Sequence, residues 1–243
     1  MTPTQNPRHP VHHRAVRLFR AGLCLLATIA LAGCTLTWSP PAPEQAPPSA
    51  AAGPAITPQA AASALETLET LRIQGRAPKT GYDRRQFLDG WPSVKGCDLR
   101  NRTLSRDLTD IQFKPGTNNC VVISGILNDP YTGQSIPFTR GQDTSSAVQI
   151  EHVVSIGDSW QKGAQQWDDD RKEAFAADPE NLLAVDGPAN MQKQDSDFAT
   201  WQPPNKSFRC QYAAIQTHIK AKWELWVTQA EHDAMKNTLT ACA

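Results

Sequence analysis

Helical spacing of hydrophobic residues marks both ends of the region that follows residue 57. Thr57 and Pro58 supply an N-cap and a first-turn proline, and the leucines after them predict a short helix that stops before Gly75. Thr228 with Glu231 forms a capping-box pattern that opens a last helix. Between these two helices, a stripe of aromatic and aliphatic residues predicts a further helix with one packing face: Tyr212, Ile215, Ile219, Trp223 and Trp226.

Strand patterns occupy the middle of the chain. β-Branched residues fill 120–127, the turn sequence NDPYTG follows, and 134–140 returns as the second arm of a hairpin. Hydrophobic and polar positions alternate over 147–154, which predicts another strand, and 181–185 predicts a short one. Helices and strands in these amounts predict an α+β fold.

Two helices are predicted around the short strand. The polar stretch from 155 to 180 predicts a loop with one helix around 168–177. After the strand, Pro188 opens a helix that is predicted to run through Asn190 to Thr200. The second half of the domain therefore alternates strand, loop, helix, strand and helix.

The first 33 residues have the pattern of an export signal. Four arginines precede an apolar core over 21–32, about half the length that a membrane-spanning helix needs. The run LAGC ends at Cys34 and resembles a bacterial lipobox, which implies cleavage before Cys34 and lipidation of that residue. The alternative is a plain secretory signal in which Cys34 is incidental. Residues 34–57 are rich in Pro and Ala and predict an extended tether, so a single domain is expected over 58–243.

Four cysteines remain in this exported domain: Cys97, Cys120, Cys210 and Cys242. Thiols in an oxidising compartment predict two disulfides, and their spacing allows three pairings. We favour Cys97 with Cys120 and Cys210 with Cys242, because each bond closes a local segment. A four-cysteine zinc site is the alternative, and the lack of a CxxC pair disfavours it.

The charge balance excludes several classes of protein. The chain has 24 Lys and Arg against 24 Asp and Glu, which excludes a strongly basic nucleic-acid binder. The single long apolar run, at the N-terminus, excludes a multi-span membrane protein. Loss of residues 1–33 removes four Arg and no acid, which leaves 20 bases against 24 acids and a net charge of −4. Binding of a polyanion then depends on local regions such as 72–114, where ten bases face five acids.

A strand ending in Glu151 and His152, a strand beginning at Asn181 and a helix carrying Asn190 follow one another in the chain. The sequence around them resembles HNH-family endonucleases with a ββα-metal core, specifically small secreted bacterial proteins similar to the C-terminal domain of GmrSD-type restriction enzymes. The resemblance covers about residues 72–242 and implies that core with an additional β-hairpin and C-terminal helices. It rests on these runs: CDLRNRTLSRDL (97–108), SGILNDPYTG (124–133), QIEHVVSIGDSWQKGA (149–164), FAADPENLLAVDGPANMQKQDSDFATWQPPN (175–205) and CQYAAIQTHIKAKWELWVT (210–228).

The resemblance implies a role for each of four residues. His152 is the expected general base, because a neutral imidazole titrates near working pH. Glu151 and Asn190 are the expected ligands of a divalent metal, Mg²⁺ or alternatively Mn²⁺, because hard oxygen donors suit it. Asn181 is expected to hold the backbone around the histidine. The family has Asp before the His, so Glu151 is a departure that leaves direct or water-mediated ligation open.

Each of these residues also has a plain structural alternative. His152 could be a buried strand histidine, Glu151 a strand-end carboxylate, Asn181 an ordinary turn residue and Asn190 a helix-surface amide. Arg100, Arg106, Arg171 and Lys193 are candidate contacts to substrate phosphate, since cationic side chains pair with phosphate oxygens. Surface solubility, or an ion pair of Lys193 with Asp197, explains them equally simply.

We therefore expect an exported, lipid-anchored endonuclease that cleaves DNA with a divalent metal, with RNA left open as a second substrate. Strong sequence specificity is not expected, because no helix-turn-helix or zinc-finger pattern accompanies the core. The alternative from a different class is a cell-envelope lipoprotein that keeps the fold, lacks turnover and binds nucleic acid or another polyanion.

Overall fold

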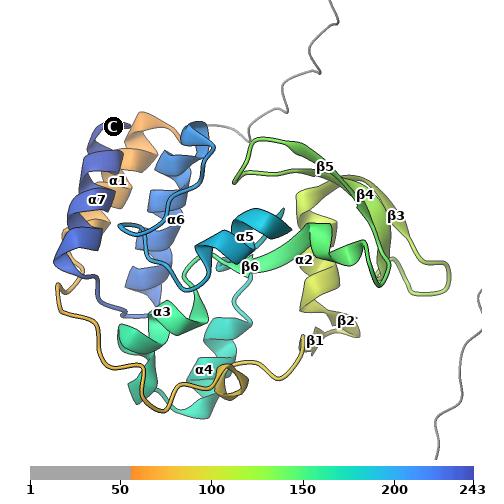
Figure 1. Cartoon of the computed structure of the whole chain (residues 1–243), viewed down its shortest axis with the longest axis horizontal. Coiled ribbons are helices and arrows are strands. Elements are labelled where there is room, and N and C mark those ends of the chain that lie inside the picture. Colours follow the sequence, from red (N-terminus) through yellow and green to blue (C-terminus); the bar gives the residue numbers. More distant parts are fainter. Residues whose placement is uncertain (1–55) are drawn as a thin grey trace, which may run out of the picture. The chain divides into compact units, whose positions relative to one another are not determined.

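The computed structural model describes residues 56–243, which form an α+β domain (Figure 1). The predicted signal, most of the tether and Cys34 lie outside the described residues. The helices of the described range are α1 (Pro58–Leu68), α2 (Leu99–Asp107), α3 (Ile156–Gln161), α4 (Asp169–Ala176), α5 (Gly187–Lys193), α6 (Arg209–Lys222) and α7 (Gln229–Thr240). The strands are β1 (Ser93–Val94), β2 (Cys97–Asp98), β3 (Leu108–Phe113), β4 (Val122–Asn128), β5 (Ser135–Thr139), β6 (Val148–His152) and β7 (Leu182–Asp186). Within 56–243, no helix is long and apolar enough to cross a bilayer.

Helices α1, α6 and α7 pack together on one side of the domain (Figure 1). The predicted caps are confirmed: the Thr57 hydroxyl accepts a hydrogen bond from Ala60 N at 3.2 Å, and the Thr228 hydroxyl accepts one from Glu231 N at 3.2 Å. The predicted stripe is partly wrong, because α6 ends at Lys222 and Trp226 lies beyond it. The Trp226 indole donates to the Gly75 carbonyl at 3.1 Å instead.

A three-stranded antiparallel sheet with the order β3-β4-β5 packs with α2 on the other side. The β4–β5 pair is the predicted hairpin, whereas α2 and β3 had no prediction. Cys97 bonds to Cys120 and thereby ties β2 to the loop before β4, and Cys210 bonds to Cys242 and ties the start of α6 to the end of the chain. Both favoured pairings are confirmed.

Strands β6 and β7 form a separate antiparallel pair between these two groups. On one side, Val148 and Ile150 of β6 pack into the core shared with α2 and the three-stranded sheet. On the other side, Val185 of β7 and Ala189 of α5 pack into the core of the α1, α6 and α7 group. The strand pair is therefore fixed from both sides by apolar burial.

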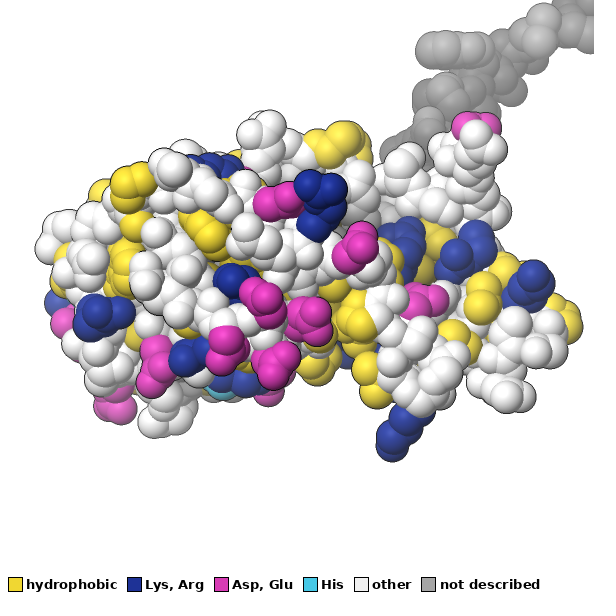
Figure 2. Space-filling model, turned by 90° about the horizontal axis from the view of Figure 1, so that it is seen from below, with side chains coloured by type: hydrophobic (Ala, Val, Ile, Leu, Met, Phe, Trp, Pro, Cys, Tyr) yellow, Lys and Arg dark blue, Asp and Glu magenta, His cyan; other side chains and the backbone are white. Residues whose placement is uncertain are grey.

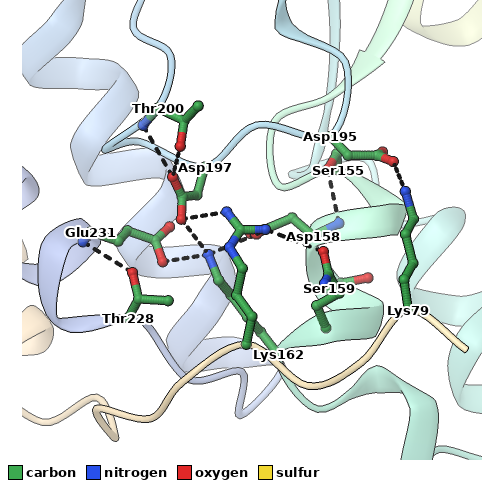
Figure 3. A network of polar contacts seen from close by, with 12 residues as sticks. Lys79, Ser155, Asp158, Ser159, Lys162, Asp195, Asp197, Thr200, Thr228 and Glu231 are labelled. Carbon is green, nitrogen blue, oxygen red and sulfur yellow. Dashed lines mark hydrogen bonds and ion pairs between the residues drawn. The ribbon is translucent and has the colours of Figure 1, made fainter.

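A balanced group of buried charges joins α3, α6 and α7 (Figure 3). The Lys162 amine lies 2.7 Å from Asp158, 3.0 Å from Asp197 and 2.6 Å from Glu231. Lys220 lies 2.8 Å from Asp158 and 3.0 Å from Glu231, and Arg76 lies 2.6 Å from Asp197. We call the three buried carboxylates, the two buried lysines and the partly exposed Arg76 the buried charge cluster.

The helix predicted from Pro188 to Thr200 ends at Lys193 in α5, so its predicted length is wrong. Gln194 follows with a φ of 50°, which no helix continues through. Asp197 then caps a turn, because its Oδ1 accepts from the Thr200 backbone N at 3.1 Å. The lysine and the aspartate predicted to share one helix face therefore separate, and Asp197 belongs to the buried charge cluster.

Candidate active site

The β6–β7 pair leads directly into α5, which packs on both strands. His152 pairs with Leu182 at one end of the pair, and Val148 pairs with Asp186 at the other. The Asp186 carboxylate caps α5 by accepting from Ala189 N at 2.8 Å. Gly187 permits the tight connection, since a Cβ there would lie 2.1 Å from the Ser146 carbonyl oxygen. Strand, strand and helix therefore lie in contact as one unit.

His152 is buried, with 3% of its surface exposed, and its ring orientation is fixed by two neighbours. Nε2 lies 2.9 Å from the Ala176 carbonyl oxygen, which accepts only from a protonated nitrogen. This bond places the proton of the neutral ring on Nε2 and leaves Nδ1 as a proton acceptor. The Trp91 indole stacks nearly parallel to the ring, with centroids 6.3 Å apart. Burial lowers the pKa of His152 to about 4, so the ring is neutral at neutral pH.

Asn181 lies fully buried just before β7 and bonds the backbone beyond the histidine. Its side-chain oxygen accepts from Val154 N at 2.8 Å, and its side-chain nitrogen donates to the Val154 carbonyl at 3.1 Å. One amide therefore satisfies both backbone groups of a residue that follows His152 by two positions. The chain after β6 cannot move without breaking both bonds.

Glu151 is buried beside His152 and forms an ion pair with Lys193. The Tyr131 hydroxyl donates to the same carboxylate oxygen, Oε1, at 3.4 Å. Burial raises the pKa of Glu151, and Lys193 opposes this effect. Lys193 is 0% exposed and also donates to the His152 carbonyl at 3.2 Å. Its amine is thus occupied inside the protein, where it holds α5 against the end of β6 and faces no substrate phosphate.

Asn190 is half-buried on α5 and uses only part of its side chain for protein contacts. Its Nδ2 donates to the Gln149 Oε1 at 2.9 Å. The side-chain oxygen, Oδ1, has no hydrogen-bond donor among residues 56–243. The atom that could ligate a metal is therefore the one that the fold leaves free.

Glu151, His152 and Asn190 line one cavity of about 180 Å³, together with Arg84, Ser155 and Asp195. The structure thus brings three of the predicted site residues to one place. In the described part of the chain, no group of three or more His, Cys, Asp or Glu side chains is arranged to hold a metal ion. The donor set is one carboxylate and one amide oxygen, which fits a magnesium ion that keeps several of its waters. Lys193 occupies one oxygen of Glu151, so ligation would use the other.

The predicted arginine contacts are all engaged by other protein groups outside this cavity. Arg100 donates to the Ser145 and Val148 carbonyls at 3.2 and 3.1 Å. Arg106 donates to the Pro179 and Leu182 carbonyls at 2.7 and 2.6 Å. Arg171 pairs with Glu224 at 2.7 Å and lies over the Trp167 ring. These three guanidinium groups brace loops and strand ends.

Sequence reasoning missed Arg84, which lines the cavity, and Trp91 and Tyr131, which contact its lining residues His152 and Glu151. Arg84 was one base in a basic run, Trp91 had no pattern to mark it, and Tyr131 was part of a turn sequence. Arg84 and Trp91 belong to the segment that links α1 to β1, far from His152 along the chain. The available signal was the basic region 72–114 that contains Arg84, but only the folded chain shows which of its cations reaches the site.

Comparison with known proteins gives two matches. A family model for the C-terminal domain of GmrSD restriction endonucleases matches residues 98–238. An uncharacterized secreted protein of Arthroderma benhamiae is 33% identical over 205 residues, which is 83% of this chain and 92% of that protein. No solved structure matches the chain. The family match includes Glu151, His152, Asn181 and Asn190 and begins after Arg84 and Trp91.

Proposed function

The chain belongs to the family of GmrSD restriction endonuclease C-terminal domains, and from this membership we propose that it is a metal-dependent endonuclease of the HNH type. Its substrate is DNA, or RNA as a second class, cut without strong sequence specificity. The observation that carries the proposal is the meeting of three groups at one cavity: a neutral histidine with a fixed tautomer, a carboxylate and a free amide oxygen.

His152 acts as the general base in this proposal. Its Nδ1 takes a proton from the attacking water while the new O–P bond forms and the bond to the leaving oxygen breaks. The leaving oxygen then takes a proton from solvent. The Ala176 carbonyl and the Trp91 ring hold the imidazole, and Asn181 holds the backbone that follows it. These contacts support a base that needs no rearrangement before reaction.

Glu151 and Asn190 are the proposed ligands of the divalent metal. When bound, the metal neutralises charge on the phosphoryl and leaving oxygens. Tyr131 and Lys193 orient the Glu151 carboxylate, and Gln149 orients the Asn190 amide so that its oxygen is presented to the cavity. Mg²⁺ is the preferred ion and Mn²⁺ the alternative, because both accept hard oxygen donors.

Digestion of plasmid DNA tests the enzyme assignment. The purified chain, with both disulfides formed, should nick and then linearise plasmid in Mg²⁺ or Mn²⁺ and stop when a chelator is added. His152→Ala should lose turnover and still bind DNA. Equal inertness of the wild type and His152→Ala across divalent metals, on both DNA and RNA, would contradict the proposal and favour a nucleic-acid-binding lipoprotein without turnover.

Export and lipid anchoring at Cys34 are the second part of the proposal. The match to a secreted protein and the two disulfides support export, because disulfides persist in oxidising compartments. A lipidated Cys34 anchors the domain through the tether to the cell envelope. In a bacterial host, Cys34→Ser should move the protein from the detergent-extracted membrane fraction to the soluble exported fraction. An unchanged distribution would mean that Cys34 carries no anchor.

A further inference from the structure

Arg84 reaches the candidate active site from a segment that the family match does not include. It begins a short 3₁₀ turn between α1 and β1 and lines the cavity with Glu151, His152 and Asn190. The family match starts at residue 98, so the role of this segment does not follow from family membership. Arg84 is solvent-exposed and its side chain hydrogen-bonds the Tyr82 hydroxyl, whereas the carboxylates of the cavity are paired with lysines.

The segment that carries Arg84 is firmly attached to the domain. The Ala77 backbone N donates to the Gln161 carbonyl at 2.9 Å, and the Gln161 side chain donates back to the Ala77 carbonyl at 3.1 Å. Phe87, three residues after Arg84, is 0% exposed and packs against Trp160 and Phe175. These contacts fix the backbone on both sides of Arg84, and Arg84 lines the cavity from this fixed backbone position.

Charges around the cavity leave the guanidinium of Arg84 unmatched. The Glu151 carboxylate is paired with Lys193, and the Asp195 carboxylate lies 2.6 Å from the Lys79 amine (Figure 3). Among residues 56–243, no carboxylate lies within ion-pair distance of Arg84. One positive charge therefore remains at the mouth of the cavity.

The two arginines on either side of Arg84 in this segment are both paired with carboxylates. Arg76 pairs with Asp197 at 2.6 Å, and Arg85 pairs with Asp83 at 2.6 Å. The arginines predicted from the sequence to bind phosphate are likewise engaged elsewhere. A guanidinium that is exposed, lines the site and lacks a carboxylate partner has the donors and the charge to bind a phosphate.

We propose that Arg84 binds a non-bridging oxygen of the scissile phosphate and stabilises the charge that develops there during hydrolysis. This inference rests on the proposed nuclease function and adds the group that contacts the substrate. Arg84 donates hydrogen bonds and transfers no proton, so the balance of the hydrolysis is unchanged. The contact makes the segment between α1 and β1, which carries Arg84, part of the active site, although the family match does not include that segment.

Binding to a short fluorescein-labelled DNA duplex tests the contact independently of turnover. In the non-cleaving His152→Ala chain with Mg²⁺, the added Arg84→Ala change should weaken binding about tenfold and lower the slope of log Kd against log [KCl] by about 1. The matched control is Arg85→Ala in the same background, since Arg85 is the adjacent, exposed arginine and is paired with Asp83. It should change Kd by less than about twofold.

Cleavage by chains that retain His152 tests the role in the reaction. Arg84→Ala should lower kcat about 100-fold, as expected for loss of one positioned charge donor. Millimolar guanidinium should restore part of the lost rate in Arg84→Ala and none in Arg85→Ala. Arg84→Lys should keep the salt slope of binding and recover only part of kcat, because the ammonium lacks the planar fork.

The outcomes separate this inference from the function on which it rests. If the wild type cleaves and Arg84→Ala leaves Kd, salt slope and kcat unchanged, the Arg84 contact is wrong and the nuclease function stands. If no metal supports cleavage but Arg84→Ala weakens DNA binding as expected, the nuclease function is wrong and the phosphate contact stands. If the wild type neither cleaves nor binds DNA or RNA with any divalent metal, both are overturned.

Discussion

At the scale of one residue, the burial of His152 sets the pH range in which this histidine can act as a general base. The pKa of His152 falls to about 4 from the ordinary 6.5 because the charged ring would be desolvated. The folded protein therefore keeps a neutral base at pH values where an exposed histidine is protonated.

The acid limb of kcat/KM should consequently lie near pH 4 and not near 6.5. The sign follows from the direction of the shift: a lowered pKa keeps the base active as the pH falls, until protonation near the folded value. Initial rates on DNA from pH 3.5 to 8 at saturating Mg²⁺ measure it, with stability checked at each pH. A limb near 6.5 would show that the reacting histidine is exposed to solvent or that another group is the base.

Asn181 and Asn190 differ in how much their side-chain hydrogen bonds contribute to the stability of the fold. Asn181→Ala leaves the buried Val154 N–H and carbonyl without partners, which should lower the free energy of unfolding by about 2–4 kcal/mol. Asn190→Ala loses one half-buried bond to Gln149 and should cost about 1 kcal/mol or less. Urea unfolding of both variants gives the comparison.

The response of activity to added metal should also distinguish the Asn181→Ala and Asn190→Ala variants. Asn190→Ala should remove most turnover at near-normal stability, and excess Mg²⁺ or Mn²⁺ should restore part of it, because a metal ligand is lost. Added metal should not restore Asn181→Ala. Normal activity in Asn190→Ala would exclude its side-chain oxygen from the metal site.

At the scale of elements, the sequence predicted what local pattern and caps determine. Thr57 and Thr228 mark helix starts because their hydroxyls bond backbone within one turn. The end of α5 had no such local signal: Asp197 leaves the predicted helix to meet Lys162, the residue that follows α3. The order of strand, strand and helix made Glu151, His152, Asn181 and Asn190 candidates, and the structure places Glu151, His152 and Asn190 at one cavity. Arg84 depends on packing between distant segments, which no local pattern records.

The buried charge cluster holds those distant elements together, and its balance makes it sensitive to the loss of one member. Lys162→Met would leave Asp158, Asp197 and Glu231 with two cations for three buried carboxylates. Removing one partner from a buried group of this kind costs about 3–5 kcal/mol. Thermal unfolding should show a large fall in Tm for Lys162→Met.

The exposed pair of Lys236 and Glu69, 2.8 Å apart, provides a control of the same residue type. Lys236→Met should leave Tm nearly unchanged, because solvent screens the pair. Equal losses in the two lysine variants would mean that the buried charge cluster contributes no more than a surface ion pair.

At the scale of the whole molecule, binding of nucleic acid depends on few free cations. Without residues 1–33 the chain carries 20 bases against 24 acids. Basic side chains gather toward the end formed by α2 and the three-stranded sheet, and acidic ones lie nearer the middle of the same face (Figure 2). Within 72–114, charged or hydrogen-bonded protein partners engage Arg76, Lys79, Arg85, Arg100 and Arg106.

Arg100 bonds only backbone carbonyls, and the other bases of this region that lack an ion pair within the described residues are Arg72, Arg84, Lys95, Arg102 and Lys114. Arg72 lies over the Trp226 ring. About four cations thus remain for phosphates, which predicts a slope of log Kd against log [KCl] of about 3–4 in magnitude for the His152→Ala chain on duplex DNA. A chelator should weaken binding further, because Glu151 and Asp195 then face the phosphate without a metal ion. A slope near 7 would require the paired arginines to leave their protein partners when DNA binds. Affinity that is indifferent to the chelator would mean that no metal ion lies between the cavity carboxylates and the phosphate.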